Sequence, residues 1–132
     1  MQLGDSEALH FDDQTFDAVT IAFGVRNFEN LGKGLSEMNR VMKKDGIVAI
    51  IEPAEPVVFP FKQLYNLYFK GILPFVGKYF SKDDSAYTYL PQSVEAFPSR
   101  EKFIEELNKA GFKNAKFIPL TFGVAALYVA TK

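Results

Sequence analysis

Two short apolar runs with a helical pattern between them constrain the fold of this chain more than any other feature. Ala18–Phe23 and Gly46–Ile51 show no alternation with polar residues, which is typical of strands buried on both faces of a parallel sheet. Behind Asn30, a residue suited to the N-cap, apolar residues recur at helical spacing. These positions are Leu31, Leu35, Met38, Val41 and Met42. A strand, a helix and a strand in about thirty residues form a right-handed crossover, so the sequence predicts an α/β fold with parallel strands.

Polar residues follow both apolar runs and indicate where a ligand binds. Gly24 ends the first run and leads into Val25, Arg26 and Asn27, while the second run ends at Glu52. Ligands of open α/β sheets bind outside the carboxyl ends of the strands, so Arg26 and Glu52 are expected at the same sheet edge. From the residues alone, two interpretations stay open. Either this loop carries a site, or Arg26 is an ordinary surface cation and Asn27 caps a helix.

A polar turn near the N-terminus is a second candidate for ligand binding. Asp5 either accepts hydrogen bonds from a ligand amine, with the backbone amide of Ser6 donating one, or it caps local backbone. The residues alone leave both interpretations open.

An aromatic segment after the second run interrupts the α/β pattern. A proline-rich stretch leads into a helical stripe of apolar residues from Phe61 to Pro74, which includes Tyr68 and Ile72. This segment is either a core helix bordered by lysine stems, or an apolar lid over a ligand, or a face that rests on a membrane. Downstream, Tyr87 and Tyr89 either hydrogen-bond an aromatic hydroxyl or pack as amphipathic residues.

The C-terminal part of the chain predicts a helix followed by two antiparallel strands. Ser99 is expected to cap the helix and Gly111 to end it. The inward face of this helix consists of Phe103, Leu107 and Ala110. Lys113–Pro119 and Val124–Ala130 are predicted as strands, and the very short link between them requires an antiparallel pair.

Composition excludes several kinds of site. The balance of 15 Lys and Arg against 16 Asp and Glu leaves a net charge of -1, which argues against a nucleic-acid footprint. The absence of cysteine and the single histidine, His10, exclude thiolate and multi-histidine metal sites, so no metal centre is expected. The chain shows no signal-peptide pattern and no apolar stretch of spanning length, and we expect a soluble, cytoplasmic protein.

The order of the predicted elements resembles the second half of a class I methyltransferase, whose Rossmann-like sheet ends in an antiparallel hairpin strand. A closer resemblance, to the carbon-methyltransferases that methylate the quinone ring in menaquinone and ubiquinone biosynthesis, is carried by GDSEALHFDDQTFDAVTIAFGVRNFENLGKGLSEMNRVMKKDG. It continues through KQLYNLYFKGILPFVGKYFSKDDSAYTYLPQSVEAFP and LTFGVAALYVATK, and therefore covers essentially the whole chain. The most specific parts are FGVRN and AYTYLPQS.

The resemblance implies S-adenosylmethionine as the cofactor and a prenylated quinol, of the demethylmenaquinol type, as the substrate. Asp5 and Ser6 match the acidic loop that reads the adenine of the cofactor. Ala22 matches the position that lines the methionine part of the cofactor. Arg26 and Asn27 match the loop that acts on the quinol, and they are the expected catalytic residues.

The resemblance also assigns the aromatic segment to the substrate. Residues 53–98 are expected to form a helical cap inserted into the methyltransferase domain. Within this cap, Tyr68 and Ile72 are candidates for receiving the isoprenoid tail, and Tyr87 and Tyr89 for enclosing the substrate. The cap would also bring the protein into peripheral contact with a membrane.

The glycine-rich turn under the cofactor and the acidic residue that grips its ribose are missing from the sequence. Residues 1–132 are therefore interpreted as a partial domain without the N-terminal cofactor-binding half, and the isolated chain is expected to be inactive. The absent strands would leave Asp17–Phe23 as an open sheet edge, which predicts a homodimer or pairing with the missing half. The alternatives are a non-catalytic module that self-associates or binds a partner, and a methyltransferase fragment acting on another small molecule.

Overall fold

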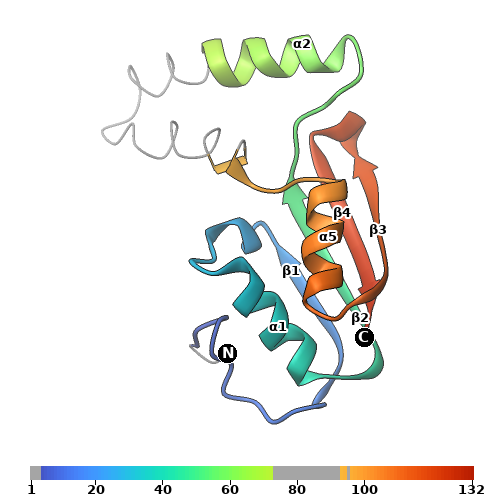
Figure 1. The fold of residues 1–132 in the computed structure, drawn as a ribbon. Helices are drawn as coiled ribbons and strands as arrows, with labels where there is room; N and C mark the ends of the chain where they lie inside the picture. The colour runs from blue at the N-terminus through green and yellow to red at the C-terminus, as the bar shows by residue number, and fades with distance from the viewer. Residues whose placement is uncertain (1–3, 73–92, 95) are drawn as a thin grey trace.

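The residues that the structure describes form an open four-stranded sheet with helices over one face (Figure 1). The computed structural model describes residues 4–72, 93–94 and 96–132. The strands are β1 (Phe16–Ala22), β2 (Met42–Pro53), β3 (Lys113–Leu120) and β4 (Ala125–Thr131). The α-helices are α1 (Leu31–Val41), α2 (Phe61–Asn66) and α5 (Glu101–Lys109). The other helical elements are η1 (Val25–Asn27), the π-helical η2 (Leu67–Ile72) and η3 (Thr121–Gly123).

The strands are ordered β1-β2-β4-β3 across the sheet. β1 runs parallel to β2, whereas β4 is antiparallel to both β2 and β3. The parallel crossover and the C-terminal hairpin predicted from the sequence are therefore confirmed. β2 begins at Met42 rather than at the expected Gly46, because Met42 already pairs with Phe16. The predicted turn is instead an irregularity inside the strand pairing, with Asp45 at a φ of 63°.

α1 and α5 contact each other and cover the same face of the sheet (Figure 1). Leu35 and Met38 of α1 are buried beneath them, as are Phe103 and Leu107 of α5, in agreement with the predicted inward faces. The sheet contributes the buried side chains of Val48, Ile50, Ala126, Tyr128 and Ala130. Full burial of one Leu or Phe side chain stabilises a protein by about 1.5–3 kcal/mol, so this contact layer holds the fold together.

Only the helix-covered face of the sheet is deeply buried, so the expectation of strands buried on both faces is wrong. Along β2, Val48 and Ile50 are 0% exposed, whereas Ile47 is 50% exposed. β1 also has a partly buried face, with Val19 and Ile21, and an exposed face with alternating Ala18, Thr20 and Ala22. In the described part of the chain, no helix packs on this second face, which explains why apolar residues there remain in contact with solvent.

The ends of α1 and α5 illustrate both a correct and an incorrect prediction. Asn30 caps α1, its side chain accepting a hydrogen bond of 3.0 Å from the Lys33 amide. The expected Ser99 cap is wrong, because α5 begins at Glu101 with Arg100 in the N-cap position. Gly111 follows the end of α5 at a φ of 93°, a left-handed conformation that suits glycine, so this predicted helix end is confirmed.

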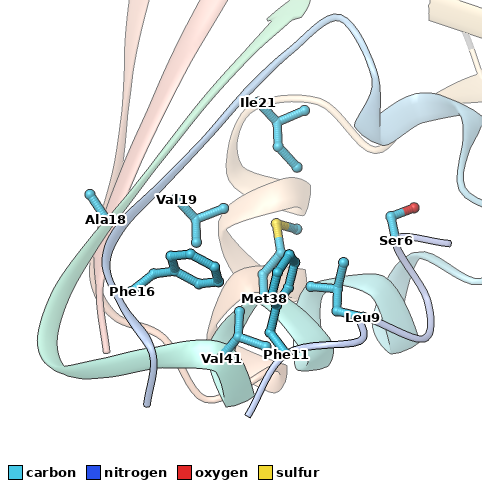
Figure 2. Close-up of a pocket in the computed structure, with 9 residues that line it drawn as sticks. All are labelled: Ser6, Leu9, Phe11, Phe16, Ala18, Val19, Ile21, Met38 and Val41. Carbon is cyan, nitrogen blue, oxygen red and sulfur yellow. The ribbon is translucent and has the colours of Figure 1, made fainter. Parts of the chain in front are cut away.

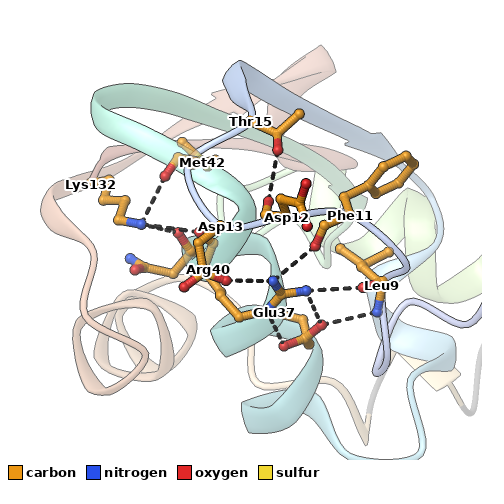
Figure 3. Close-up of polar contacts among 10 residues, drawn as sticks. Leu9, Phe11, Asp12, Asp13, Thr15, Glu37, Arg40, Met42 and Lys132 are labelled. Atoms are coloured by element: carbon orange, nitrogen blue, oxygen red, sulfur yellow. Dashed lines mark hydrogen bonds and ion pairs between the residues drawn. The ribbon is translucent and has the colours of Figure 1, made fainter.

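The N-terminal segment is tied to α1 by the side chain of Arg40 (Figure 3). Arg40 forms ion pairs with Glu37 at 2.8 Å and with Asp13 at 2.6 Å, and it also donates hydrogen bonds to the carbonyls of Leu9 and Phe11. The Leu9 amide in turn donates to Glu37 Oε2 at 2.9 Å. The hydrogen bonds between Arg40 and Glu37 lower the pKa of the Glu37 carboxyl, although desolvation by burial acts to raise it. These contacts hold the segment that carries the Asp5–Ser6 turn.

The predicted aromatic helix is present as α2 and η2, which lie beyond the carboxyl end of β2 (Figure 1). Tyr65 is its buried side chain, and burial raises the pKa of the Tyr65 hydroxyl. Leu64, Leu67, Tyr68 and Ile72 are instead 46–62% exposed. The described part of this segment is therefore an exposed apolar surface rather than a core helix. The predicted end at Pro74, and Tyr87 and Tyr89, lie outside the described residues.

Candidate functional site

The loop after β1 is fixed at the carboxyl ends of the two parallel strands. The Phe23 amide donates to the carbonyl of Ile51 at 2.8 Å, which extends the contact between the strands beyond Ala22. Gly24 then leads into η1, a single 3-10 turn in which the Asn27 amide donates to the Gly24 carbonyl. This tight turn brings Arg26 back toward the end of β2, as the topology predicted.

Arg26 forms a buried ion pair with Glu52. Arg26 Nη1 lies 3.0 Å from Glu52 Oε2 and also donates to the Phe23 carbonyl at 2.8 Å. The other carboxylate oxygen, Oε1, accepts a 2.7 Å hydrogen bond from the Val25 amide. The Glu52 side chain is 0% exposed and that of Arg26 is 12% exposed. Arg26 is therefore not the ordinary surface cation of the alternative interpretation.

Part of the Arg26 guanidinium has no partner. Its Nε atom is buried and finds no hydrogen-bond acceptor among the residues that the structure describes. Arg26 also lines a cavity of about 300 Å³ between η1, the start of α1 and the segment around Phe97. The described residues that line this cavity are Val25, Arg26, Phe28, Leu31, Ser93, Ala96, Phe97 and Pro98. Arg26 is the one charged residue among them, so the cavity suits an aromatic ligand that carries an oxygen acceptor.

A second cavity brings the Asp5–Ser6 turn next to Asn27. This space of about 290 Å³ is lined by Asp5, Ser6, Glu7, Asn27, Phe28 and Glu29. Asp5 Oδ1 accepts a 2.8 Å hydrogen bond from the Glu7 amide, so Asp5 does cap local backbone. The carboxylates and the Phe28 ring together offer acceptors and an apolar surface, which fits an aromatic ligand with an amine group.

An apolar recess lies beside β1, and Ser6 borders it (Figure 2). Its volume is about 320 Å³, and its walls come from the N-terminal segment, β1 and α1. Figure 2 shows Val19, Ile21 and Met38 around this recess, with Ser6 at its rim. Ser6 thus lies between an apolar and a polar cavity.

The remaining predicted site residues lie apart from these cavities. Ala22 is exposed at the carboxyl end of β1, where it pairs with Ile51. Tyr68 is 48% and Ile72 46% exposed on η2, and neither lines a cavity described above. The structure therefore brings Asp5, Ser6 and Asn27 together but does not group them with the two η2 residues.

Glu52 was expected at this edge but was not predicted as a site residue. The available signal was a carboxylate directly after an apolar strand and on the same edge as a polar loop. The sequence could not show that the carboxylate would be buried against Arg26.

The part of the chain that the structure describes is further characterised by the grouping of its His, Asp and Glu side chains and by the length of its helices. It contains no group of three or more His, Asp or Glu side chains placed to hold a metal ion. None of its helices combines the length and the apolar character needed to cross a membrane.

Comparison with known proteins establishes the family. The sequence model of the ubiE/COQ5 methyltransferase family matches residues 1–132. The chain belongs to this family. A relative in Bacteroides fragilis, named demethylmenaquinone methyltransferase, is 50% identical over 128 residues, which are 97% of this chain and 52% of that protein. Another, the ubiquinone/menaquinone biosynthesis C-methyltransferase UbiE of Citrifermentans bemidjiense, is 48% identical over 132 residues, 100% of this chain and 56% of that protein.

Solved structures confirm the fold of this ubiE/COQ5 family member. A SAM-dependent methyltransferase from Thermotoga maritima matches with a TM-score of 0.67 at 19% identity, covering 98% of this chain and 62% of that one. A second one, from Aquifex aeolicus, matches with a TM-score of 0.60 at 16% identity, over 97% and 52% of the two chains. The sheet is therefore the predicted class I methyltransferase type. The chain spans about half the length of the curated relatives that it matches.

Proposed function

We propose that the protein containing this chain transfers a methyl group from S-adenosylmethionine to a ring carbon of a prenylated quinol of the demethylmenaquinol type. Membership of the ubiE/COQ5 family supports methyl transfer, and the names of the relatives support the quinol. The observation that carries the proposal is the Arg26 guanidinium. It is held at the carboxyl ends of two parallel strands, and its buried Nε–H has no acceptor among the described residues.

The residues around the Asp5–Ser6 turn fit the cofactor. Asp5 and the Ser6 amide would hold the adenine, since the cavity that they share with Asn27 offers carboxylate acceptors beside an aromatic ring. Ala22 would line the methionine part, because it is exposed at the end of β1. When bound, S-adenosylmethionine supplies the electrophilic methyl group.

Arg26 stabilises the quinol as its ring carbon becomes nucleophilic. The carbon gains electron density when the neighbouring hydroxyl loses its proton. The carbon–methyl bond would form as the sulfur–methyl bond breaks, after which the ring carbon loses its own proton to water and the phenolate regains one. A guanidinium group keeps its protons at any physiological pH, so Arg26 cannot be the base, and the proton passes to water. Instead, Arg26 donates a hydrogen bond to the developing phenolate, and Asn27 orients the ring or that water.

The exposed apolar surface of α2 and η2 receives the isoprenoid tail. Tyr68 and Ile72 are about half exposed, and covering them removes apolar area from water at roughly 25 cal/mol per Å². Nearby, Val57, Val58 and Phe59 are 59–76% exposed, which favours peripheral contact with a membrane that holds the substrate. Tyr87 and Tyr89 would complete the enclosure.

A transfer assay tests this function directly. The protein is incubated with S-adenosylmethionine labelled in its methyl group and with demethylmenaquinol, and the products are identified by mass spectrometry. We expect a label on the quinol ring carbon. Label found only on a non-quinol acceptor, or no transfer at all, would overturn the proposal.

A pair of substrates tests the tail site. The substitutions Tyr68→Ser and Ile72→Ser should raise the KM of a long-tailed quinol several-fold but leave the KM of a short-tailed quinol unchanged. Equal effects on both quinols would contradict the assignment. Lys109→Ser, on the exposed end of α5, is a control for surface substitution.

A second candidate function, self-association, is favoured by the open edge of β1. This strand is at the end of the described sheet, and one of its two sides has no strand partner there. Unpaired edges bind other strands, most simply as a symmetric dimer or with a further part of the same protein. Residues 1–132 alone are then expected to dimerise and to bind S-adenosylmethionine weakly. A stable monomer in sedimentation, or tight binding in titration calorimetry, would contradict this.

A further inference from the structure

Glu52 lies in a place where a carboxylate is expensive to bury. Its side chain is 0% exposed and continues the row of buried residues Val48 and Ile50 along β2. Removing a carboxylate from water costs several kcal/mol even when it is paired, and apolar residues of similar volume often replace buried ion pairs without loss of stability. Stability alone therefore does not account for a glutamate directly after the apolar run Gly46–Ile51 of β2.

The two oxygens of Glu52 hold two successive residues of the loop. Oε1 accepts the Val25 amide at 2.7 Å, and Oε2 accepts Arg26 Nη1 at 3.0 Å. The Phe23 carbonyl accepts from the same nitrogen of Arg26 at 2.8 Å. Among the described residues, the guanidinium is thus held through Nη1. The opposite part of the group, at Nε, makes no hydrogen bond with the described residues.

Glu52 also sets the charge of the site. Glu52 forms the ion pair with Arg26, and no other described residue that lines the Arg26 cavity is charged. The pair is neutral as a whole, so Arg26 acts on a ligand oxygen mainly as an oriented hydrogen-bond donor. Tyr128 of β4 is the further titratable group that senses this carboxylate, and burial is the main cause of its raised pKa.

We propose that Glu52 is a positioning residue of the methyl transfer: it anchors the Val25–Arg26 turn and aligns the guanidinium, which lines the cavity, so that it can donate a hydrogen bond to the quinol oxygen. Glu52 does not line the cavity, and it acts on the substrate only through Arg26. This role rests on the proposed function, in which Arg26 stabilises the developing phenolate.

Two substitutions separate the effect of the Glu52 charge from the effect of its side-chain length. Glu52→Gln keeps the shape but removes the charge, which leaves the Arg26 cation uncompensated beside the quinol. The ionised quinol is then favoured. The acid limb of the pH profile of kcat should therefore move to a lower pH by about one unit. Glutamine has one acceptor oxygen where glutamate has two, so it cannot accept from both Val25 and Arg26. The displaced Arg26 should lower the plateau kcat by about 10- to 100-fold, with little change in the quinol KM. Glu52→Asp keeps the charge but shortens the reach, so it should lower kcat without moving the limb.

Glu55→Gln is the matched control, because it removes the same charge from a nearby glutamate that is not paired with Arg26. We expect its kcat and pH profile to equal those of the parent. A Glu52→Gln profile that coincides with the parent profile would overturn the proposal. So would a loss of kcat in both Glu52 variants that merely follows the folded fraction, with no movement of the limb, as a purely structural role requires.

A measurement without turnover separates this proposal from the proposed function. The Arg26 Nε–H signal and the exchange rate of the Val25 amide are followed by NMR in the parent and in Glu52→Gln. We expect a shifted Nε–H signal and faster Val25 exchange in the variant, while unchanged values would overturn the positioning role. If the parent shows no quinol methylation, the proposed function fails by itself, and the NMR result still decides whether Glu52 holds Arg26.

Discussion

Arg26 and Arg40 both form ion pairs with glutamates, yet they use their guanidinium groups differently. All three nitrogens of Arg40 donate to protein oxygens, and its partner Asp13 is 70% exposed. Arg26 is bound through Nη1, is paired with a fully buried glutamate, and retains a buried Nε–H with no acceptor among the described residues. A saturated arginine fastens one segment to another, whereas an arginine that lines a cavity and keeps a donor without an acceptor among the described residues suits a ligand. The two guanidinium groups therefore differ in whether an N–H donor remains without an acceptor among the described residues.

The largest expected effect distinguishes the two arginines by activity. Arg26→Lys should lower the kcat for quinol methylation by about 100-fold, because an ammonium group cannot hold Glu52 and present a second donor in the same plane. Arg40→Lys should act mainly on the KM of S-adenosylmethionine, since it loosens the segment that carries Asp5. Steady-state kinetics of both variants checks this. Equal kcat and pH profiles for Arg26→Lys and the parent would remove Arg26 from its role.

The next effect distinguishes the two ion pairs by stability. Glu52→Ala leaves a mostly buried cation without its partner, and we expect a loss of about 3–5 kcal/mol in the free energy of unfolding. Asp13→Ala removes an exposed partner of Arg40, and its unfolding midpoint should not change measurably. Urea unfolding of the two variants measures the contrast. Similar urea midpoints for the two variants would mean that the buried Arg26–Glu52 pair contributes no more to stability than the exposed Arg40–Asp13 pair.

A smaller effect concerns local opening at Arg40. Arg40→Met removes the hydrogen bonds to the carbonyls of Leu9 and Phe11 but leaves the helix-sheet core intact. Amide exchange of the N-terminal segment, residues 5–15, should become a few-fold faster, while α5 exchanges as in the parent. Exchange that accelerates equally in both regions would show that Arg40 supports the whole fold. Lys43→Met, which breaks an exposed pair with Asp17, is the matched control.

The smallest effect is a pH dependence confined to the Arg40 network. The pKa of Glu37 is lowered in the folded protein, first by its hydrogen bond with Arg40. The ionised Glu37 therefore stabilises the folded state fully above the ordinary glutamate pKa, about 4.3. This stabilisation is lost as the pH falls through the lower pKa that Glu37 has in the folded protein. Arg40 remains charged throughout, since its own pKa is raised by Glu37 and Asp13. Amide exchange of the Leu9 region should accelerate when the pH falls below the pKa of Glu37 in the folded protein. Glu37→Gln should abolish this pH dependence of the exchange rate.

Local features of the fold could be predicted from local sequence. The spacing of Leu35 and Met38 predicted the buried face of α1, and Asn30 predicted its start, because helix periodicity and capping involve residues within a few positions. The Ser99 cap failed for a non-local reason. The Arg100 amide at the start of α5 donates to the Tyr128 hydroxyl, 28 residues away in the sequence, at 2.8 Å.

Burial and the site depended on contacts between distant elements. Apolar runs such as Ala18–Phe23 predict a strand, but how many faces are buried depends on what packs on each side of the sheet. Topology predicted that Arg26 and Glu52 share an edge, since the ends of parallel strands meet there. It did not predict that Glu52 would bind both Val25 and Arg26, nor that Asn27 would share a cavity with Asp5.

The amino-acid sequence by itself determined the class of the fold, the parallel crossover with its C-terminal hairpin, and the family, because these follow from periodicity, order and motif. Tertiary structure alone decided which arginine is saturated and which retains a donor without an acceptor among the described residues. The physical reason is that hydrogen-bond satisfaction is a property of three-dimensional neighbours. Glu37 lies three residues from Arg40 on the same helix, whereas Glu52 reaches Arg26 only through the pairing of two strands.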